Sequence, residues 1–351
     1  MTDVSPSLDA VKDYYGRILG GMKDLKSNAC KCVESLPASH RAILDQIAPE
    51  ILERFYGCGS PIPEALEGMT VLDLGCGTGR DVYLASRLVG RTGRVIGVDM
   101  TDEPLELARR HQASQAERFG HGRSNVEFVK GYIEDLGALG IADESIDVVI
   151  SNCAINLSPR KDAVFAEIFR VLKPGGELHF SDVFAGRRLP RELGEDPELL
   201  CECLGGAMYI EDFRRLLHGL GCPDYRTVSR SRIQLGSPEI EAKVGAIDFH
   251  TVKVRAFKLA GLEDICEDYG QVAWYLGTIP DHPFRFALDD HHTFEKGKPM
   301  LVCGNTAAMV ADTRFGKHFK VTGDRSVHHG PFACSPVVGA APAAACGGSC
   351  C

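Results

Sequence analysis

The chain has 351 residues, of which 44% are hydrophobic and 25% are charged, as is ordinary for a globular protein with a buried core. Its formal net charge of −9, without a basic run, argues against nucleic-acid binding. The N-terminus lacks the charged-then-apolar pattern of a signal peptide, and no apolar stretch reaches the roughly 18 residues of a membrane helix. We therefore predict a cytoplasmic protein with no membrane or nucleic-acid partner, built as two domains or as one elaborated domain.

Two helices are predicted near the N-terminus. Residues 6–25 and residues 38–55 both carry apolar residues three to four positions apart, and a turn-rich string follows at residues 56–61. We assign residues 1–39 to an N-terminal helical segment and begin the next domain at residue 40.

From residue 69 short apolar segments alternate with helical patterns. The expected strands cover residues 70–74, 94–98, 125–129, 146–150 and 177–180, and the expected helices cover residues 82–88, 104–118 and 164–172. Strands that are apolar along their whole length and alternate with helices are buried on both faces. The pattern predicts an α/β fold, a doubly wound and mostly parallel sheet, over residues 40–205.

Beyond residue 205 the alternation weakens. Residues 210–220 form a helical pattern, and residues 252–259 alternate like a half-exposed strand. We predict a smaller C-terminal α+β region over residues 206–334, which is expected to cover the functional site. Residues 335–351, rich in Ala, Pro, Gly and Cys, are predicted to be a disordered tail.

A glycine-rich loop follows the first predicted strand, with Gly75, Gly77 and Gly79 preceded by Asp73. Glycines here let the backbone turn tightly into a helix and approach a ligand closely. A dinucleotide-binding G-x-G-x-x-G loop requires glycine at position 80, where this chain has Arg80. The G-x-G-x-G spacing resembles the first motif of class I methyltransferases, which implies S-adenosylmethionine as the cofactor. A dinucleotide-dependent dehydrogenase or an inactive relative is the alternative.

Other positions around this loop agree with that class. Asp99 ends the second predicted strand, where a carboxylate can accept both hydroxyls of a ribose. Residues 131–134 follow the third strand, where this fold holds an adenine ring, and Asn152 ends the fourth strand. The residues expected to bind the cofactor are Tyr56, Asp73, Gly75, Cys76, Gly77, Asp99, Met100, Thr101, Ile133, Glu134 and Asn152.

The 14 cysteines are the most unusual feature of the composition. No C-x-x-C pair occurs, so zinc-finger and thioredoxin-like interpretations lack their signature. Cys58, Cys153 and Cys203 lie near the expected cofactor crevice or its rim. Cysteine is otherwise a small hydrophobic residue that is often buried without a chemical role. We expect that role for Cys76, Cys222, Cys266 and Cys303, and leave Cys32 and Cys201 undecided.

Several segments together resemble the arsenite methyltransferase family over about residues 10–325. The segments are residues 24–30, 56–59, 151–157 and 202–207, with weaker echoes at residues 306–308 and 314–315. The resemblance implies methylation of trivalent arsenic, as in arsenic detoxification, with catalytic roles for Cys30, Cys58, Cys153 and Cys203. It also implies a disulfide between Cys30 and Cys58 that an external reductant, thioredoxin or glutathione, resets. Cys32 could replace Cys30 in that role.

Arsenic chemistry agrees with this resemblance. Trivalent arsenic is soft and binds thiolates, so we expect Cys58, Cys153 and Cys203 to hold it. Its lone pair can then attack a sulfonium methyl group, and no general base is needed. The alternatives are a class I methyltransferase acting on carbon or oxygen of an organic molecule, and a metalloid-binding protein without activity. The tail cysteines, Cys346, Cys350 and Cys351, either capture metalloid or have no catalytic role.

Overall fold

The computed structural model describes residue 12, residues 36–55 and residues 57–333. The helix predicted over residues 6–25 lies outside the described residues except for residue 12. Cys30, Cys32, Tyr56 and the tail over residues 335–351 also lie outside them.

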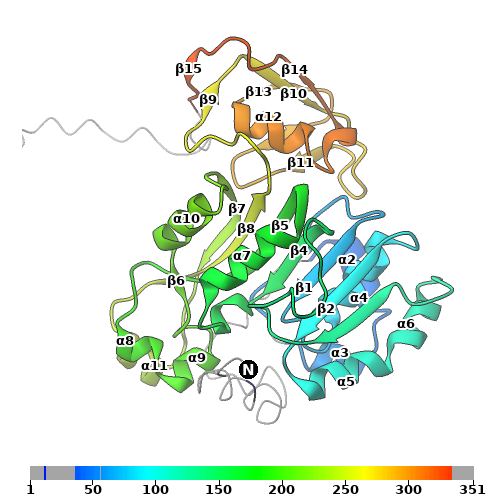
Figure 1. Ribbon diagram of the computed structural model, residues 1–351, viewed down its shortest axis with the longest axis vertical. Coiled ribbons are helices and arrows are strands. Elements are labelled where there is room, and N and C mark those ends of the chain that lie inside the picture. The colour runs from blue at the N-terminus through cyan, green and yellow to red at the C-terminus, as the bar shows by residue number, and fades with distance from the viewer. Residues whose placement is uncertain (1–11, 13–35, 56, 334–351) are drawn as a thin grey trace, which may run out of the picture.

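A mixed eight-stranded sheet forms the centre of the molecule (Figure 1). Its strands are β1 (Thr70–Leu74), β2 (Arg94–Asp99), β3 (Val126–Lys130), β4 (Ile146–Asn152), β5 (Leu172–Ala185), β6 (Met208–Tyr209), β7 (Tyr225–Arg232) and β8 (Phe249–Phe257). The order is β3-β2-β1-β4-β5-β8-β7, and β6 pairs with the end of β5. Strands β1 to β5 are parallel, whereas β8 runs antiparallel to both β5 and β7. The predicted doubly wound, mostly parallel α/β fold is confirmed.

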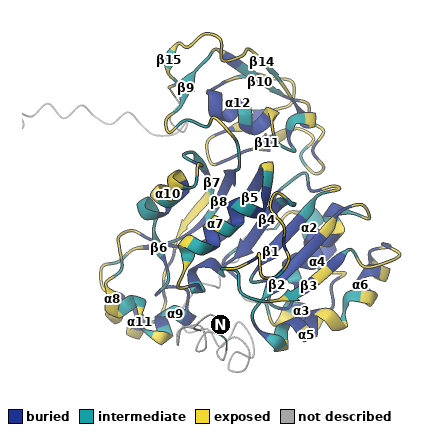
Figure 2. Cartoon of the chain, viewed as in Figure 1, coloured by how far each residue is buried: buried dark blue, intermediate teal, exposed yellow. Residues whose placement is uncertain are grey.

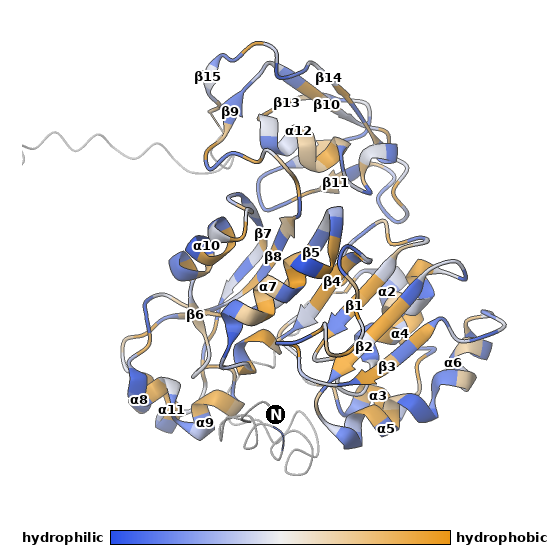
Figure 3. Ribbon diagram, in the orientation of Figure 1, coloured by the Kyte–Doolittle hydropathy of each residue, from blue (hydrophilic) through white to orange (hydrophobic). Residues whose placement is uncertain are grey.

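Helices cover both faces of this sheet. They are α2 (Ala38–Leu44), α3 (Pro49–Glu53), α4 (Arg80–Val89), α5 (Asp102–Arg110), α6 (Gln112–Arg118), α7 (Lys161–Val171), α8 (Arg191–Gly194), α9 (Pro197–Cys201), α10 (Ile210–Gly219) and α11 (Pro238–Val244), with a short 3-10 helix, η3 (Ile155–Leu157). Apolar residues of α2, α4 and α5 pack on one face, and those of α7 and α10 pack on the other. The strands between these layers are buried and apolar (Figures 2 and 3), which explains why they read as continuous apolar segments.

Two segments predicted as single helices are each divided. The segment over residues 38–55 forms α2 and α3, because Pro49 cannot continue a helix and instead begins the second one. The segment over residues 104–118 forms α5 and α6, which meet at His111. Pro104 lies in the first turn of α5, where its missing N–H has no intrahelical partner to lose.

The central sheet extends well beyond residue 205, where the sequence placed the end of the methyltransferase domain. Strand β8 pairs with β5 from Glu177 to Ala185, and β7 completes the edge. The segment predicted as a half-exposed strand is therefore an inner strand, and most of β8 is buried. Strand β8 is antiparallel and comes from a later part of the chain, outside the alternating βα pattern, so that pattern could not predict its position in the sheet.

A smaller region follows the sheet and has its own apolar core. It contains β9 (Glu267–Asp268), β10 (Gln271–Tyr275), β11 (Arg285–Ala287), β12 (Thr293–Glu295), β13 (Pro299–Val302), α12 (Gly304–Ala311), η4 (Gly316–His318), β14 (Phe319–Thr322) and β15 (Gly330–Pro331). Strands β13, β10 and β14 form a three-stranded sheet, and α12 packs against it. No helix among the described residues is long and apolar enough to span a membrane.

Buried charges attach this C-terminal region to the central sheet. Glu177, near the start of β5, pairs with Arg255 of β8 at 2.6 Å and with Arg314 of the C-terminal region. Arg255 also pairs with Glu64 at 2.6 Å. The part of the predicted 206–334 region that forms these contacts lies above β5 in Figure 1, whereas Ile233, Leu235, Ile240, Val244 and Phe249 of the same region pack in one cluster with Cys58, Cys153 and Cys203.

Candidate active site

The glycine-rich loop turns from β1 into α4 in a conformation that suits glycine. Gly75, Gly77 and Gly79 all have positive φ angles, between 50° and 85°. A Cβ atom at Gly75 would lie 2.2 Å from the Cβ of Ala154, and one at Gly79 would lie 2.8 Å from the Phe128 ring. The Gly77 position has open space where a Cβ would be, so the backbone there is available to a ligand.

A pocket opens above this loop at the carboxyl ends of the parallel strands. Ten of the residues expected to bind the cofactor line it, namely Asp73, Gly75, Cys76, Gly77, Asp99, Met100, Thr101, Ile133, Glu134 and Asn152. Tyr56 lies outside the described residues. The pocket also contains residues that the sequence did not single out, namely Arg54, Phe55, Asp81, Leu157 and Ser158. The position agrees with the rule that ligands of open α/β sheets bind where the strand order reverses, here between β1 and β4.

Buried carboxylates give the pocket an acidic floor. Asp99 accepts hydrogen bonds from the backbone N–H groups of Gly77 (2.8 Å) and Thr101 (2.9 Å), while burial raises its pKa. Burial and the neighbouring carboxylates of Asp81 and Asp99 raise the pKa of Asp73 well above its ordinary value. Carboxylates crowded in this way favour a ligand that brings positive charge and hydroxyl donors. The sulfonium, amino group and ribose of S-adenosylmethionine fit that requirement.

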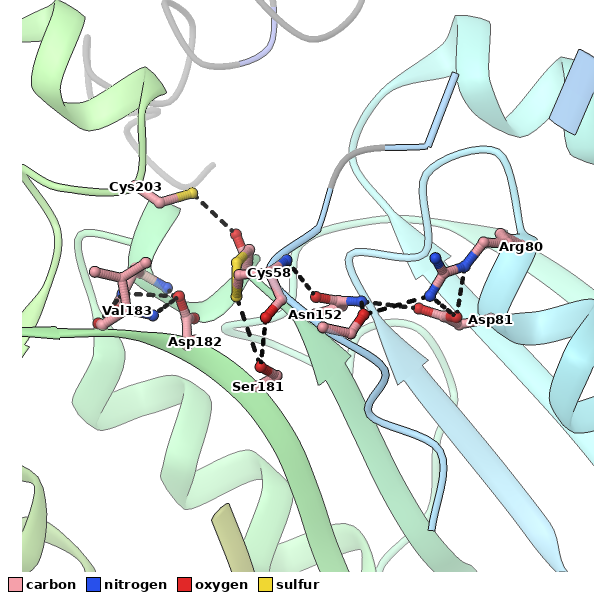
Figure 4. Close-up of a disulfide and its surroundings, with 11 residues drawn as sticks. Cys58, Arg80, Asp81, Asn152, Ser181, Asp182, Val183 and Cys203 are labelled. Carbon is pink, nitrogen blue, oxygen red and sulfur yellow. Dashed lines mark hydrogen bonds and ion pairs between the residues drawn. A yellow bond between two sulfur atoms is a disulfide. The ribbon is translucent and has the colours of Figure 1, made fainter. Parts of the chain in front are cut away.

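A polar network connects this pocket to the segment that carries Cys58 (Figure 4). The side chain of Asn152 accepts a hydrogen bond from the Cys58 N–H at 3.0 Å and donates to the Gly59 carbonyl at 2.8 Å and to Asp81 at 3.1 Å. Arg80 pairs with Asp81 at 2.6 Å. The residue that fills the third glycine position of a dinucleotide-binding loop therefore orients a carboxylate at the pocket wall.

Three cysteines meet beside the pocket. Cys58 and Cys153 form a disulfide, with Cα atoms 6.0 Å apart, and the Cys203 thiol donates to the Cys153 carbonyl oxygen at 3.4 Å (Figure 4). Gly206, close in sequence to Cys203, packs directly on the backbone of Asn156, since a Cβ there would lie 1.9 Å from the Asn156 carbonyl oxygen. All three cysteines belong to one buried apolar cluster, and Cys153 also lines the pocket.

The disulfide differs from the pairing that the family resemblance implied. Cys58 was expected to pair with Cys30, but it is bonded to Cys153. Because one sulfur forms one disulfide at a time, a bond between Cys30 and Cys58 is incompatible with this state. The sequence contained no signal for the observed pair, whose members are separated by 95 positions.

Cys153 and Cys203 both have left-handed backbone conformations, with φ angles of 54° and 60°. Residues other than glycine, asparagine and aspartate rarely adopt this conformation, which is costly for a side chain that has a Cβ. Such outliers persist where the surrounding structure holds them, and they concentrate at functional sites.

Asp182 is a site residue that the sequence did not indicate. One of its oxygens lies close enough to the sulfurs of Cys58 and Cys153 for the three to share a small ligand. It accepts hydrogen bonds from the N–H groups of Val183 (2.8 Å) and Asn156 (3.1 Å), yet burial raises its pKa to about 7. The nearest sequence signal was only that it follows an apolar strand.

The four cysteines expected to be ordinary buried residues, Cys76, Cys222, Cys266 and Cys303, are all free of disulfides. Burial raises the pKa of Cys76 well above its ordinary value and raises that of Cys222 to about 12. Cys201, which the sequence left undecided, lies beside the three-cysteine cluster, and burial with the nearby Cys203 raises its pKa to about 11. A raised pKa disfavours the thiolate that binds metalloids.

The fold and pocket define a class I S-adenosylmethionine-dependent methyltransferase, and comparisons with known proteins place the chain more closely. Residues 65–221 match a methyltransferase domain, and residues 269–338 match the arsenite methyltransferase C-terminal domain. The chain is 50% identical to an arsenite methyltransferase of Aquipseudomonas alcaligenes over 92% of its length and 93% of that protein. It is 40% identical to the mouse (Mus musculus) arsenite methyltransferase over 89% of its length and 82% of that protein.

A solved structure agrees with these relatives. The crystal structure of an arsenic(III) S-adenosylmethionine methyltransferase from Chlamydomonas reinhardtii matches with a TM-score of 0.83 and 50% identity, over 85% of this chain and all of that one. The chain belongs to the arsenite methyltransferase family, as its sequence motifs predicted.

Proposed function

We propose that this enzyme methylates trivalent arsenic held by the thiolates of Cys58, Cys153 and Cys203. The observation that carries the proposal is the meeting of these three cysteines in one buried cluster, with Cys153 shared between the cluster and the acidic pocket. The names of the relatives, which describe arsenite or arsenic(III) as the acceptor, support the same substrate.

Binding of the substrate begins with the reduction of the disulfide between Cys58 and Cys153. Two electrons and two protons from an external thiol, thioredoxin or glutathione, convert it into two thiols, and the donor becomes oxidised to its own disulfide. Arsenous acid then exchanges its three hydroxyl groups for three cysteine sulfurs and releases three water molecules. Soft thiolates are the ligands that such a centre selects.

The pocket residues hold the methyl donor beside this substrate. S-adenosylmethionine supplies an electrophilic methyl group on a sulfonium. Asp99 is placed to accept hydroxyl donors, and Asp73 with Asp81 provides negative charge near the glycine-rich loop. Asn152 fixes the Cys58 segment against Asp81 through its hydrogen bonds, and so sets the position of the arsenic ligands relative to the pocket.

The arsenic lone pair, which three sulfur ligands leave uncovered, takes the methyl group, and arsenic is formally oxidised from the trivalent to the pentavalent state. Two of its thiolates then leave as a disulfide, their two electrons return to arsenic, and a hydroxide from water takes up a vacated position. The disulfide between Cys58 and Cys153 is the product expected of this step. Cys30, implied by the resemblance, is proposed as a further thiol of the redox cycle, and detoxification of arsenic as its biological use.

The proposal is tested by arsenite-dependent methylation, with separation of methylated arsenicals and arsenic-specific mass detection. The prereduced enzyme receives arsenite and labelled S-adenosylmethionine, with and without continued supply of a thiol reductant. We expect one turnover without continued reductant and many with it. Cys153→Ser and Cys203→Ser are expected to lower the single-turnover rate by at least about 100-fold, the effect of misplacing a reacting atom.

Cys222→Ser is the matched control, because Cys222 is a buried thiol that lies outside the three-cysteine cluster. It is expected to retain the native rate. Native single-turnover rates in Cys153→Ser or Cys203→Ser, with folding verified by circular dichroism, would contradict the thiolate site. Label transfer that does not depend on arsenite would favour an organic acceptor instead.

A further inference from the structure

A second pair of cysteines lies in the C-terminal region, away from the disulfide site. Cys303 ends the loop between β13 and α12, and Cys266 immediately precedes β9. Helix α12, which Cys303 caps, packs against β9, and the pKa of Cys303 is lowered first by its interaction with the Cys266 side chain, so the two thiols lie close together although most of the C-terminal region separates them in sequence. The sequence had assigned both to ordinary buried positions, because nothing in it indicated that they meet.

The surroundings of Cys303 favour a thiolate. Its sulfur caps α12, accepting from the Thr306 N–H at 3.4 Å, and lies 3.3 Å from the Thr306 hydroxyl. A guanidinium nitrogen of Arg226, a buried residue, donates to the same sulfur at 4.0 Å. The hydrogen bond from Cys266, those from Thr306 and the positive charge of Arg226 lower the pKa of Cys303 to about 4, although burial opposes them. A thiolate at neutral pH is the form that binds metalloids.

The two thiols differ in access. Cys303 is completely buried, whereas Cys266 is partly exposed. The backbone of Cys266 is held by Phe332, whose N–H donates to its carbonyl oxygen at 2.8 Å. A small ligand from solvent can therefore bind Cys266 first and then reach the buried thiolate.

We propose that Cys266 and Cys303 form a second arsenic site, and that its ligand is a monomethylated trivalent arsenical. The number of thiols in the site determines which arsenical it can bind with all exchangeable positions filled by sulfur. Inorganic arsenite has three exchangeable hydroxyl groups and matches three sulfurs, a monomethylated arsenical has two, and a dimethylated one has a single group. A pair of thiols satisfies the monomethylated species completely.

The binding step is a ligand exchange without oxidation. Two As–O bonds break and two As–S bonds form, the hydroxyl groups leave as two water molecules with the proton of the Cys266 thiol and one from solvent, and arsenic stays trivalent. The site itself does not need methyl transfer, but the source of its ligand rests on the function proposed above. It would then retain a product of the enzyme at the opposite end of the sheet from the pocket.

The test measures bound arsenic in full-length protein that lacks two of the three proposed active-site thiols. The parent carries Cys153→Ser and Cys203→Ser, is reduced, is incubated with monomethylarsonous acid and is desalted, and its ratio of arsenic to protein is then measured by elemental mass spectrometry. Adding Cys303→Ser or Cys266→Ser is expected to remove one equivalent of arsenic in each case. Serine keeps the N-cap at position 303, and position 266 is partly exposed, so both variants are expected to fold.

Cys222→Ser in the same parent is the control and is expected to bind as much arsenic as the parent. An unchanged ratio in either test variant overturns the proposal. A loss of bound arsenic in Cys266→Ser but not in Cys303→Ser also overturns it, because the second sulfur ligand would then be a residue other than Cys303. Dimethylarsinous acid should be lost on desalting, since its single bond to sulfur gives no chelate; equal retention of it would also overturn the two-thiol site. The parent lacks two proposed catalytic thiols, so the result is independent of whether the native enzyme methylates arsenite.

Discussion

Glu177 is the buried anion between two buried cations, and Glu177→Gln is expected to weaken the attachment of the C-terminal region. The carboxylate is completely buried and pairs with Arg255, itself 1% exposed, and with Arg314, 5% exposed. Glutamine keeps the volume of the side chain but removes its charge. Glu64, 26% exposed, remains as the other anion in contact with Arg255.

The magnitude follows from burial. Removing one partner of a buried ion pair leaves uncompensated charge and costs about 3–5 kcal/mol. The expected loss of unfolding free energy is in that range, because two guanidinium groups lose their shared anion. Trp274, the only tryptophan of the chain, lies in β10 and makes fluorescence a selective probe of the C-terminal region during urea unfolding.

The matched control is Glu64→Gln, which removes a partly exposed anion from the same cluster. Its effect is expected to be about 1 kcal/mol, as for exposed pairs. The reasoning would be refuted by a Glu177→Gln transition, followed at Trp274, that shifts no further than that of Glu64→Gln. Circular dichroism measured in parallel reports whether the central sheet unfolds in the same step.

Three further predictions concern single side chains. Asp99→Asn is expected to weaken S-adenosylmethionine binding by about 10- to 100-fold, the value of hydrogen bonds to a charged group; calorimetry that gives the native Kd would refute this. Asn152→Ala removes three hydrogen bonds, including that from the Cys58 N–H, and is expected to lower the unfolding free energy by about 1–3 kcal/mol; a loss below about 0.5 kcal/mol would contradict it. Burial alone would raise the pKa of Asp289, but the hydrogen bond from His292 and nearby positive charges lower it. Its ionised form therefore adds stability above about pH 4, and this stability is lost as the pH falls. When unfolding free energy is followed at Trp274 as a function of pH, Asp289→Asn is expected to lose less stability at acid pH than the native protein does. Parallel pH curves for the two proteins would exclude this role.

Local patterns were sufficient for the parallel part of the fold. Strand β1 has the predicted bounds and β4 begins where predicted, because a strand buried on both faces is apolar at every position and is interrupted by helices. The place of β8 could not be inferred in this way. Strand β8 lies beside β5 because its residues pair with Glu177 to Ala185, which are far away in sequence. The sequence of a strand does not indicate which other strand it pairs with.

The candidate site, like the fold, contains features that local sequence predicted and features that depend on long-range contacts. The glycine-rich loop and Asp99 lie next to one another through local strand ends, so their sequence spacing was informative. The pairing of Cys58 with Cys153 and the contact of Cys266 with Cys303 are long-range facts set by the complete fold. Asp182 was missed because an acidic residue at the end of an apolar segment has no distinctive spacing.

The left-handed conformation of Cys203 costs stability at a position that we propose as an arsenic ligand. Glycine adopts that conformation without the roughly 1–2 kcal/mol that a side chain costs. A library of variants sorted only for survival at high temperature is therefore expected to enrich glycine at position 203, whereas sorting for arsenite methylation is expected to retain cysteine if Cys203 has the role proposed above. Efforts to raise the thermal stability of this protein should therefore leave position 203 unchanged.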